Sequence, residues 1–194
     1  MTTFNIHMSG VGGQGIGLLS EVLLRAADHA GLSVKSVYTH GLAQRGGIVV
    51  SQVRIGSEAH SPLIPAHAAD LVVALERHEA LRAAHAALKA GGVLIYYDAV
   101  WQPLAVRLGQ APEVSAEAVA EKCDALGARL IRVHRPNLTD ARMQNIVVLA
   151  HIQRLGLIQQ LEAAHYQRAM EDLLRGSTLE ENLALFHAER QLAP

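Results

Sequence analysis

The stretch Phe4–Tyr38 reads FNIHMSGVGGQGIGLLSEVLLRAADHAGLSVKSVY, and it decides the fold class of this chain. A short strand-like run, Phe4–Met8, leads into the glycine-rich segment Gly10–Gly15, and apolar residues at helical spacing follow over Ile16–Ala30. A second strand is expected at Ser33–Tyr38. Strand, glycine turn, helix and strand in this order are typical of a βαβ unit, which predicts an α/β domain.

The rest of the chain continues this alternation and then becomes helical. The further strands that we expect are Ile48–Ile55, Asp70–Leu75, Val93–Tyr97 and Arg129–His134. The expected helices are Glu76–Ala90, stopped by Gly91 and Gly92, one capped by Ser115 and closed at Gly127, Asn137–Leu155, Glu162–Arg175, and a last one that opens with the capping box Ser177–Glu180 and ends near Arg190. The pattern predicts a three-layer α/β/α sandwich with a mostly parallel, mixed sheet, a Rossmann-like start and a helical C-terminal tail. We expect one domain over 1–194, with 137–194 as its helical C-terminal part.

Composition excludes several classes of protein. Half of the 194 residues are apolar, and the formal net charge of −1 disfavours nucleic acid or an anionic membrane as partner. Cys123 is the only cysteine, so no disulfide and no self-contained iron–sulfur cluster is expected, since a cluster needs about four thiolates. The lone thiol, the absence of a leader pattern in Met1–Ser9 and the lack of a spanning apolar run predict a cytoplasmic protein. The eleven histidines are scattered, so we expect no metal site.

The glycine-rich segment matches the pattern GxGxxG. Its residues are Gly10, Val11, Gly12, Gly13, Gln14 and Gly15. Such a turn lets the backbone approach a ligand, and the free N–H groups at a helix start favour negative charge. Dinucleotide binding also needs an acidic residue after the second strand, where this chain has Tyr38, Thr39 and His40. A structural turn, a dinucleotide site and a site for another anion therefore all stay open, and Gln14 either contacts the ligand or caps the helix.

A second polar loop, Thr39–Gly47, follows the second strand and reads THGLAQRGG. It should emerge at the same edge of the sheet as the glycine turn, where α/β proteins place functional loops. His40, Gln44 and Arg45 provide an imidazole, an amide and a guanidinium that could bind a carboxylate or phosphate. The alternative is an ordinary surface turn.

Three motifs in order carry a resemblance to a known family. The turn Gly10–Gly15, the loop Thr39–Gly47 and Ser61–Pro65 ahead of Asp70–Glu76 resemble the gamma-type domain of 2-oxoacid:ferredoxin oxidoreductases, and among these the small subunit of the indolepyruvate type. The segment Thr139–Leu157 resembles the later helical part of that domain.

The resemblance implies one subunit of a larger enzyme that is not active alone. A large partner subunit would carry thiamine diphosphate and [4Fe-4S] clusters, coenzyme A would be a co-substrate, and ferredoxin would accept the electrons. The substrate would be a 2-oxoacid such as indolepyruvate or another aryl pyruvate. The residues expected to contact substrate or coenzyme A are Gly10, Gly12, Gly13, Gln14, Gly15, His40, Gln44 and Arg45. A stand-alone NAD(P)-binding dehydrogenase and a non-catalytic scaffold subunit are the alternatives.

Six further residues have weaker expectations. Arg54 is predicted to be a structural or interface cation and Trp101 an interface anchor, while Cys123 is predicted to be an inert packed thiol. Glu76, like Asp70, is predicted to cap a neighbouring element. Asp98 follows a buried strand, where contact with a ligand is a lesser alternative.

Overall fold

The computed structural model describes residues 3–40, 47–101, 106, 108–110 and 112–192. Within these ranges six strands form one sheet in the order β2-β3-β1-β4-β5-β6. The strands are β1 (Phe4–Val11), β2 (Val34–His40), β3 (Ile48–Ile55), β4 (Ala69–Ala74), β5 (Leu88–Tyr97) and β6 (Arg129–Val133). Neighbours from β1 through β4 and β5 to β6 are parallel, whereas β3 is antiparallel to both β1 and β2. The sheet is therefore mixed, as expected.

Strand β3 changes the opening unit from the simplest βαβ arrangement. It lies between β1 and β2, so these two strands are parallel to each other without being hydrogen-bonded neighbours. Gly10 of β1 and His40 of β2 both pair with Val49 of β3. The carboxyl ends of β1 and β2 consequently lie on either side of the same residue of β3.

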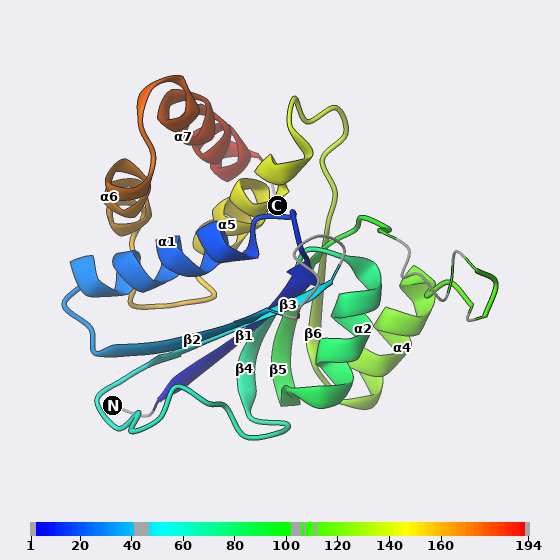
Figure 1. Ribbon diagram of the computed structural model, residues 1–194. Coiled ribbons are helices and arrows are strands. Elements are labelled where there is room, and N and C mark those ends of the chain that lie inside the picture. The colour runs from blue at the N-terminus through cyan, green and yellow to red at the C-terminus, as the bar shows by residue number, and fades with distance from the viewer. Residues whose placement is uncertain (1–2, 41–46, 102–105, 107, 111, 193–194) are drawn as a thin grey trace.

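Helices form a layer on each side of the sheet (Figure 1). One side carries α1 (Ile16–His29), α5 (Gln144–Arg154), α6 (Ala163–Leu173) and α7 (Gly176–Gln191), and the other carries α2 (Arg77–Ala86) and α4 (Ala116–Ala125). Each layer has its own core. Ile6, Leu23 and Ile146 belong to the first, and Val72 and Leu94 to the second; all five are at most 1% exposed. The three-layer α/β/α prediction is confirmed.

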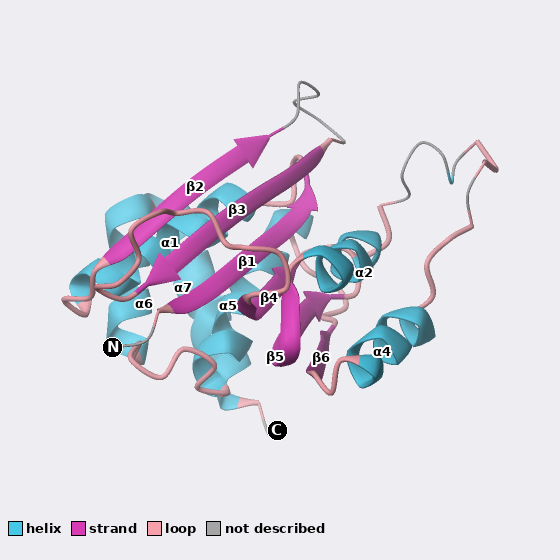
Figure 2. Cartoon of the chain, turned by 90° about the horizontal axis from the view of Figure 1, so that it is seen from below, coloured by secondary structure: helices cyan, strands magenta, loops and turns pink. Residues whose placement is uncertain are grey.

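The face of β2, β3 and β1 that is turned away from α1 has no helix over it in the part of the chain that the structure describes (Figure 2). The connection between β3 and β4 crosses this face instead. The Gln52 Oε1 atom accepts a hydrogen bond from the Ile64 backbone N–H at 2.6 Å, and Arg54 donates to the Ser61 carbonyl at 2.9 Å. Polar side chains of β3 thus hold this connection in place.

Two strand boundaries differ from the sequence prediction. β1 continues past Met8 to Val11, because β3 pairs with it as far as Val11 opposite Ile48. β5 begins at Leu88 and includes the two glycines that were expected to stop the preceding helix. At Gly92 a Cβ atom would lie 2.9 Å from the Leu88 side chain and 3.2 Å from the Ala69 carbonyl oxygen, so this glycine serves close strand packing.

The C-terminal part is helical as predicted, but two helices begin elsewhere. Instead of starting at Asn137, the chain forms a short 3-10 helix at Ala141–Met143 and then α5. Asn137 has a left-handed backbone with φ 59°, which a helix does not permit. The predicted capping box at Ser177 is wrong, because α7 already begins at Gly176 with no side-chain cap. None of the described helices combines the length and apolar character required to cross a bilayer.

Candidate functional site

The sheet has a topological switch point between β1 and β4. The chain leaves β1 for α1 on one side of the sheet, and leaves the neighbouring parallel strand β4 for α2 on the other side. In open α/β sheets, ligands bind in the crevice outside the carboxyl ends of the strands at such a point. We call the segments 12–17, 75–79 and 98–101, which follow β1, β4 and β5, the carboxyl edge.

The two glycine-rich loops meet at the carboxyl edge. The Gly12 backbone N–H donates a hydrogen bond to the Gly47 carbonyl at 2.8 Å, so the end of the second loop lies beside the first. The prediction that both loops emerge at one edge is confirmed. Of the predicted contact residues in the second loop, Gln44 and Arg45 lie outside the described residues, and His40 is described by its backbone alone.

Gln14 supports the glycine turn from within. It is fully buried, its Oε1 accepts a hydrogen bond from the Val11 N–H at 2.7 Å, and its Nε2 donates to the Leu75 carbonyl at 2.7 Å. The side chain therefore cross-links the end of β1 to the end of β4 at the base of the crevice. It does not cap α1, whose N-cap residue is Gly15 and receives no side-chain hydrogen bond.

Packing within this chain explains two glycines of the turn. A Cβ atom at Gly10 would lie 2.8 Å from Ile16, so β1 can approach the start of α1 only without a side chain there. Gly15 has φ 89°, and a Cβ atom there would lie 2.5 Å from Nδ2 of Asn145 in α5. The pattern GxGxxG is thus explained by packing at these positions and does not require a dinucleotide. β2 also lacks the acidic residue that ribose binding needs.

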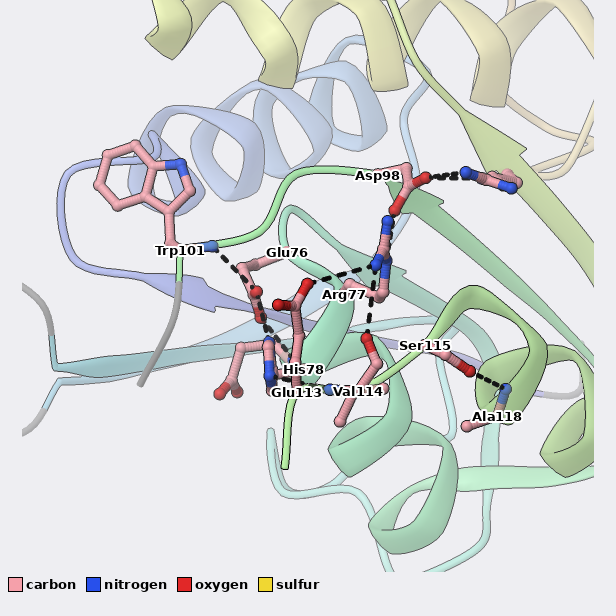
Figure 3. Close-up of polar contacts among 11 residues, drawn as sticks. Glu76, Arg77, His78, Asp98, Trp101, Glu113, Val114, Ser115 and Ala118 are labelled. Carbon is pink, nitrogen blue, oxygen red and sulfur yellow. Dashed lines mark hydrogen bonds and ion pairs between the residues drawn. The ribbon is translucent and has the colours of Figure 1, made fainter. Parts of the chain in front are cut away.

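A buried Glu–His pair lies in segment 75–79 of the carboxyl edge (Figure 3). Glu76 is 1% exposed and caps α2 by accepting a hydrogen bond from the Glu79 N–H at 2.9 Å, which confirms its predicted capping role. Its Oε1 also accepts from His78 Nδ1 at 2.8 Å and from the Trp101 N–H at 3.1 Å. His78 Nε2 accepts from the Val114 N–H at 3.2 Å, which assigns the imidazole proton to Nδ1.

Glu76 was predictable from the sequence as a cap, but its partner His78 was not. The sequence contains Glu-Arg-His-Glu at positions 76–79, directly after a buried strand. A histidine two residues after a helix-capping glutamate was the available indication. The second hydrogen bond of His78 is made to a residue 36 positions later, and no local sequence pattern indicates it.

Two buried carboxyl groups near this pair have opposite pKa shifts. Burial raises the pKa of Glu79, although the Ser9 hydroxyl donates to its Oε2 at 2.7 Å. Burial also opposes the ionisation of Asp98, but hydrogen bonds from Arg77 and Arg132 outweigh it and keep the pKa of Asp98 below its ordinary value. Asp98 is thus engaged by two guanidinium groups of this chain.

Trp101 lies at the carboxyl edge, against the glycine turn. A Cβ atom placed on Gly13 would be 3.9 Å from Cζ3 of the indole, so the ring lies near this glycine and a side chain there would just reach it. The residue nevertheless remains 41% exposed. Figure 3 shows the indole turned away from Glu76 and His78.

The remaining predicted residues have structural contacts. Arg54 bonds Asn5 Oδ1 at 2.9 Å as well as the crossing connection, which confirms a structural role. Asp70 caps no helix; it accepts from the Asn5 backbone N–H at 2.7 Å and pairs with Lys89. Cys123 is fully buried, and burial raises the pKa of its thiol, as expected of an inert packed cysteine. Across the described ranges, no group of three or more His, Cys, Asp or Glu residues could hold a metal ion.

The fold and site define an α/β/α domain whose sheet edge is of the kind that binds ligands. Its single thiol is packed in the core. The chain matches the family model described as "Pyruvate ferredoxin/flavodoxin oxidoreductase" over residues 5–192, and it belongs to that family.

Relatives in sequence carry a more specific name. The chain is 54% identical over 78 residues to an "Indolepyruvate oxidoreductase subunit IorB" from Archaeoglobus fulgidus, covering 40% of this chain and 38% of the relative. It is 36% identical over 119 residues to the subunit of the same name from Pyrococcus horikoshii, covering 61% of this chain and 58% of the relative. Both matches span less than two thirds of the relative's length.

Two solved structures share the fold. Pyruvate oxidoreductase subunit PORC from Thermotoga maritima superimposes with a TM-score of 0.69 at 20% identity, over 98% of this chain and 97% of that chain. The 2-oxoglutarate:ferredoxin oxidoreductase from Magnetococcus marinus, solved with 2-oxoglutarate, coenzyme A and succinyl-CoA bound, gives a TM-score of 0.66 at 18% identity. That match covers 98% of this chain but 31% of the other chain.

Proposed function

We propose that this chain is the small subunit of a thiamine-diphosphate-dependent 2-oxoacid:ferredoxin oxidoreductase that acts on indolepyruvate or a related aryl pyruvate. The proposal is carried by the family match over residues 5–192 together with the similarity to two indolepyruvate oxidoreductase subunits. The reaction transfers the acyl group of the 2-oxoacid to coenzyme A, releases CO2 and a proton, and passes two electrons to ferredoxin.

The cysteine content of this chain supports the placement of the redox cofactors on a larger subunit. Thiamine diphosphate supplies the decarboxylation chemistry and [4Fe-4S] clusters the electron path, and a cluster needs about four thiolates. The sequence has one cysteine, Cys123, and its side chain is buried between α4 and the sheet. The clusters therefore belong to the partner subunit in this proposal, and neither the redox step nor electron transfer takes place on this chain.

The contribution of this chain is binding at the carboxyl edge. The 2-oxoacid carboxylate and the phosphates of coenzyme A are both anionic, and the start of α1 has no side-chain cap and no acidic residue in its first turn. We assign contact with substrate or coenzyme A to the glycines Gly10, Gly12, Gly13 and Gly15 and to His40, Gln44 and Arg45, while the buried Gln14 supports the glycine turn from within. Arg45 would bind a carboxylate or phosphate through two parallel N–H donors.

Co-expression with the larger subunit tests the proposal. We expect the purified complex to reduce ferredoxin with indolepyruvate only when coenzyme A is present, and the isolated chain to reduce nothing. Reduction of an acceptor by the isolated chain would contradict the placement of the redox cofactors on the larger subunit. Full activity of the larger subunit alone would contradict a catalytic contribution from this chain.

An Arg45 variant distinguishes a role in ligand binding from a role as scaffold for the larger subunit. Arg45→Ala should raise the KM for the 2-oxoacid or for coenzyme A about tenfold or more while the complex still assembles, because a charge-assisted pair is lost. Arg168→Ala, which removes an exposed arginine of α6, is the matched control. Unchanged kinetics in the Arg45 variant would favour the scaffold alternative.

A further inference from the structure

Trp101 combines exposure with a fixed backbone. It is the only tryptophan of the chain, and 41% of it is exposed although its ring lies near Gly13. Large aromatic side chains are among the most costly to leave in contact with water. An indole that is held partly open at the carboxyl edge therefore has a free surface that a ligand can cover.

Three hydrogen bonds fix the backbone that carries this ring. The Asp98 N–H donates to the Val133 carbonyl at 2.7 Å, and the Ala99 carbonyl accepts from the Arg77 N–H at 3.0 Å. The Trp101 N–H donates to Glu76 Oε1 at 3.1 Å. Since Glu76 is 1% exposed, this last bond is shielded from water, and the indole is presented from a rigid support.

The same buried pair also fixes the chain at Val114. His78 receives the Val114 N–H at 3.2 Å, and Arg77 donates to the Val114 carbonyl at 3.4 Å (Figure 3). Glu76 and His78 are joined at 2.8 Å, so Trp101 and Val114 are both bound to one buried unit. A change at either residue would be transmitted to Trp101.

We propose that Trp101 stacks on a planar aromatic ring of a ligand bound at the carboxyl edge, and that Glu76 and His78 are positioning residues for this indole. Three observations support a ring as the ligand group: the flat exposed indole, the nearby Gly13 that places no side chain against it, and the location at the switch point of the sheet. This inference rests on the proposed function, in which two molecules carry such a ring. One is the aryl 2-oxoacid, and the other is coenzyme A through its adenine.

Kinetics of the reconstituted complex distinguish the two sources. Trp101→Leu should raise the KM about tenfold for the ring-bearing ligand with little change in kcat, whereas Trp101→Phe should retain most of the affinity. If the ring is that of the 2-oxoacid, the effect appears with indolepyruvate and not with pyruvate. If the ring is adenine, it appears with coenzyme A and not with pantetheine. Leu63→Ala, which removes a 60% exposed leucine from the connection between β3 and β4, is the control and should change neither KM.

A binding measurement makes the test independent of activity. Because the chain has one tryptophan, labelling with 5-fluorotryptophan gives a single 19F resonance when the labelled chain is combined with unlabelled partner subunit. We expect this resonance to shift on addition of the same ligand that the kinetics identify. Glu76→Gln and His78→Gln should shift or broaden it before any ligand is added, and should raise the same KM as Trp101→Leu.

Two results overturn the inference while leaving the proposed function intact. One is a resonance that moves when the partner binds but not when either ligand is added. The other is an active Trp101→Leu complex with unchanged KM values for both ligands. Failure of the proposed function is a separate outcome, in which the wild-type complex oxidises no 2-oxoacid at all.

Discussion

Glu79 is a carboxyl group whose ionisation is opposed by burial and favoured by Arg82, which lies 3.4 Å away. It is 2% exposed, accepts a hydrogen bond from Ser9, and burial raises its pKa above the ordinary value. Since the folded-state pKa lies above the unfolded one, the stabilising contribution of the neutral carboxyl is complete below the unfolded pKa. It is lost as the pH rises through the folded pKa.

Glu79→Gln should therefore stabilise the chain at higher pH. The amide stays neutral and its oxygen can still accept from Ser9, so the gain in unfolding free energy should grow from near zero in mild acid to about 1 kcal/mol at pH 8. Urea unfolding at several pH values measures it. Glu180→Gln, on the exposed side of α7, is the control and should show no such trend. A gain that is constant with pH would mean that ionisation of Glu79 is not its cause.

At the same scale, the role of a single residue was predictable from the sequence where that role depends on nearby residues. The capping role of Glu76 and the burial of Cys123 follow from position in a helix, and both predictions are confirmed. The Glu76–His78 unit could not be predicted, because its remaining bonds reach Trp101 and Val114, 25 and 36 residues further along the chain. Gln14 was ambiguous for the same reason, since its acceptor is Leu75.

At the scale of elements, the junction of α1 with α5 depends on Gly15. This glycine and Gly31, which follows the other end of α1, both have left-handed backbones, with φ 89° and 69°. A Cβ atom at Gly31 would meet nothing within 4 Å, whereas one at Gly15 would overlap Asn145. The two positions therefore share backbone strain and differ in contact.

Gly31→Ala should cost about 1 kcal/mol of unfolding free energy through backbone strain alone, and Gly15→Ala about 3 kcal/mol. Combining Gly15→Ala with Asn145→Ala should cost less than the sum of the single variants, because the overlap is then removed. Thermal and urea unfolding of the four variants measure these differences. Equal costs at the two glycines would show that α5 does not press on the turn.

The fold was largely predictable from the sequence because most elements have a local pattern. The alternation of strands and amphipathic helices gave the α/β/α layers, and a capping serine correctly located the start of α4 at Ser115. The errors occur where pairing between strands sets the boundary of a strand. β3 inserts between β1 and β2 and extends β1 to Val11, and β5 includes Gly91 and Gly92 because it pairs with β4. Such long-range pairing leaves no periodicity in the extended strand itself.

At the scale of the whole molecule, the candidate contacts lie at one edge of the sheet and the connection 56–68 leads to the other. The first-turn N–H groups of α1, at Ile16, Gly17 and Leu18, have no intrahelical acceptor and should exchange rapidly with solvent in the free chain. If ligand and partner meet at the carboxyl edge, the same amides become covered. The connection 56–68 then serves as an internal reference.

Hydrogen–deuterium exchange of the chain alone and in complex with the larger subunit measures which edge of the sheet the partner covers. We expect exchange over 16–18 to slow at least tenfold in the complex, because covered amides exchange only when the interface opens. Peptides from 56–68 should exchange as in the free chain. Protection confined to 56–68 would contradict the shared site, since the partner would then lie at the edge opposite to the glycine turn and Trp101. Protection at the carboxyl edge that increases further with coenzyme A or indolepyruvate would tie both the partner and the ligand to this surface.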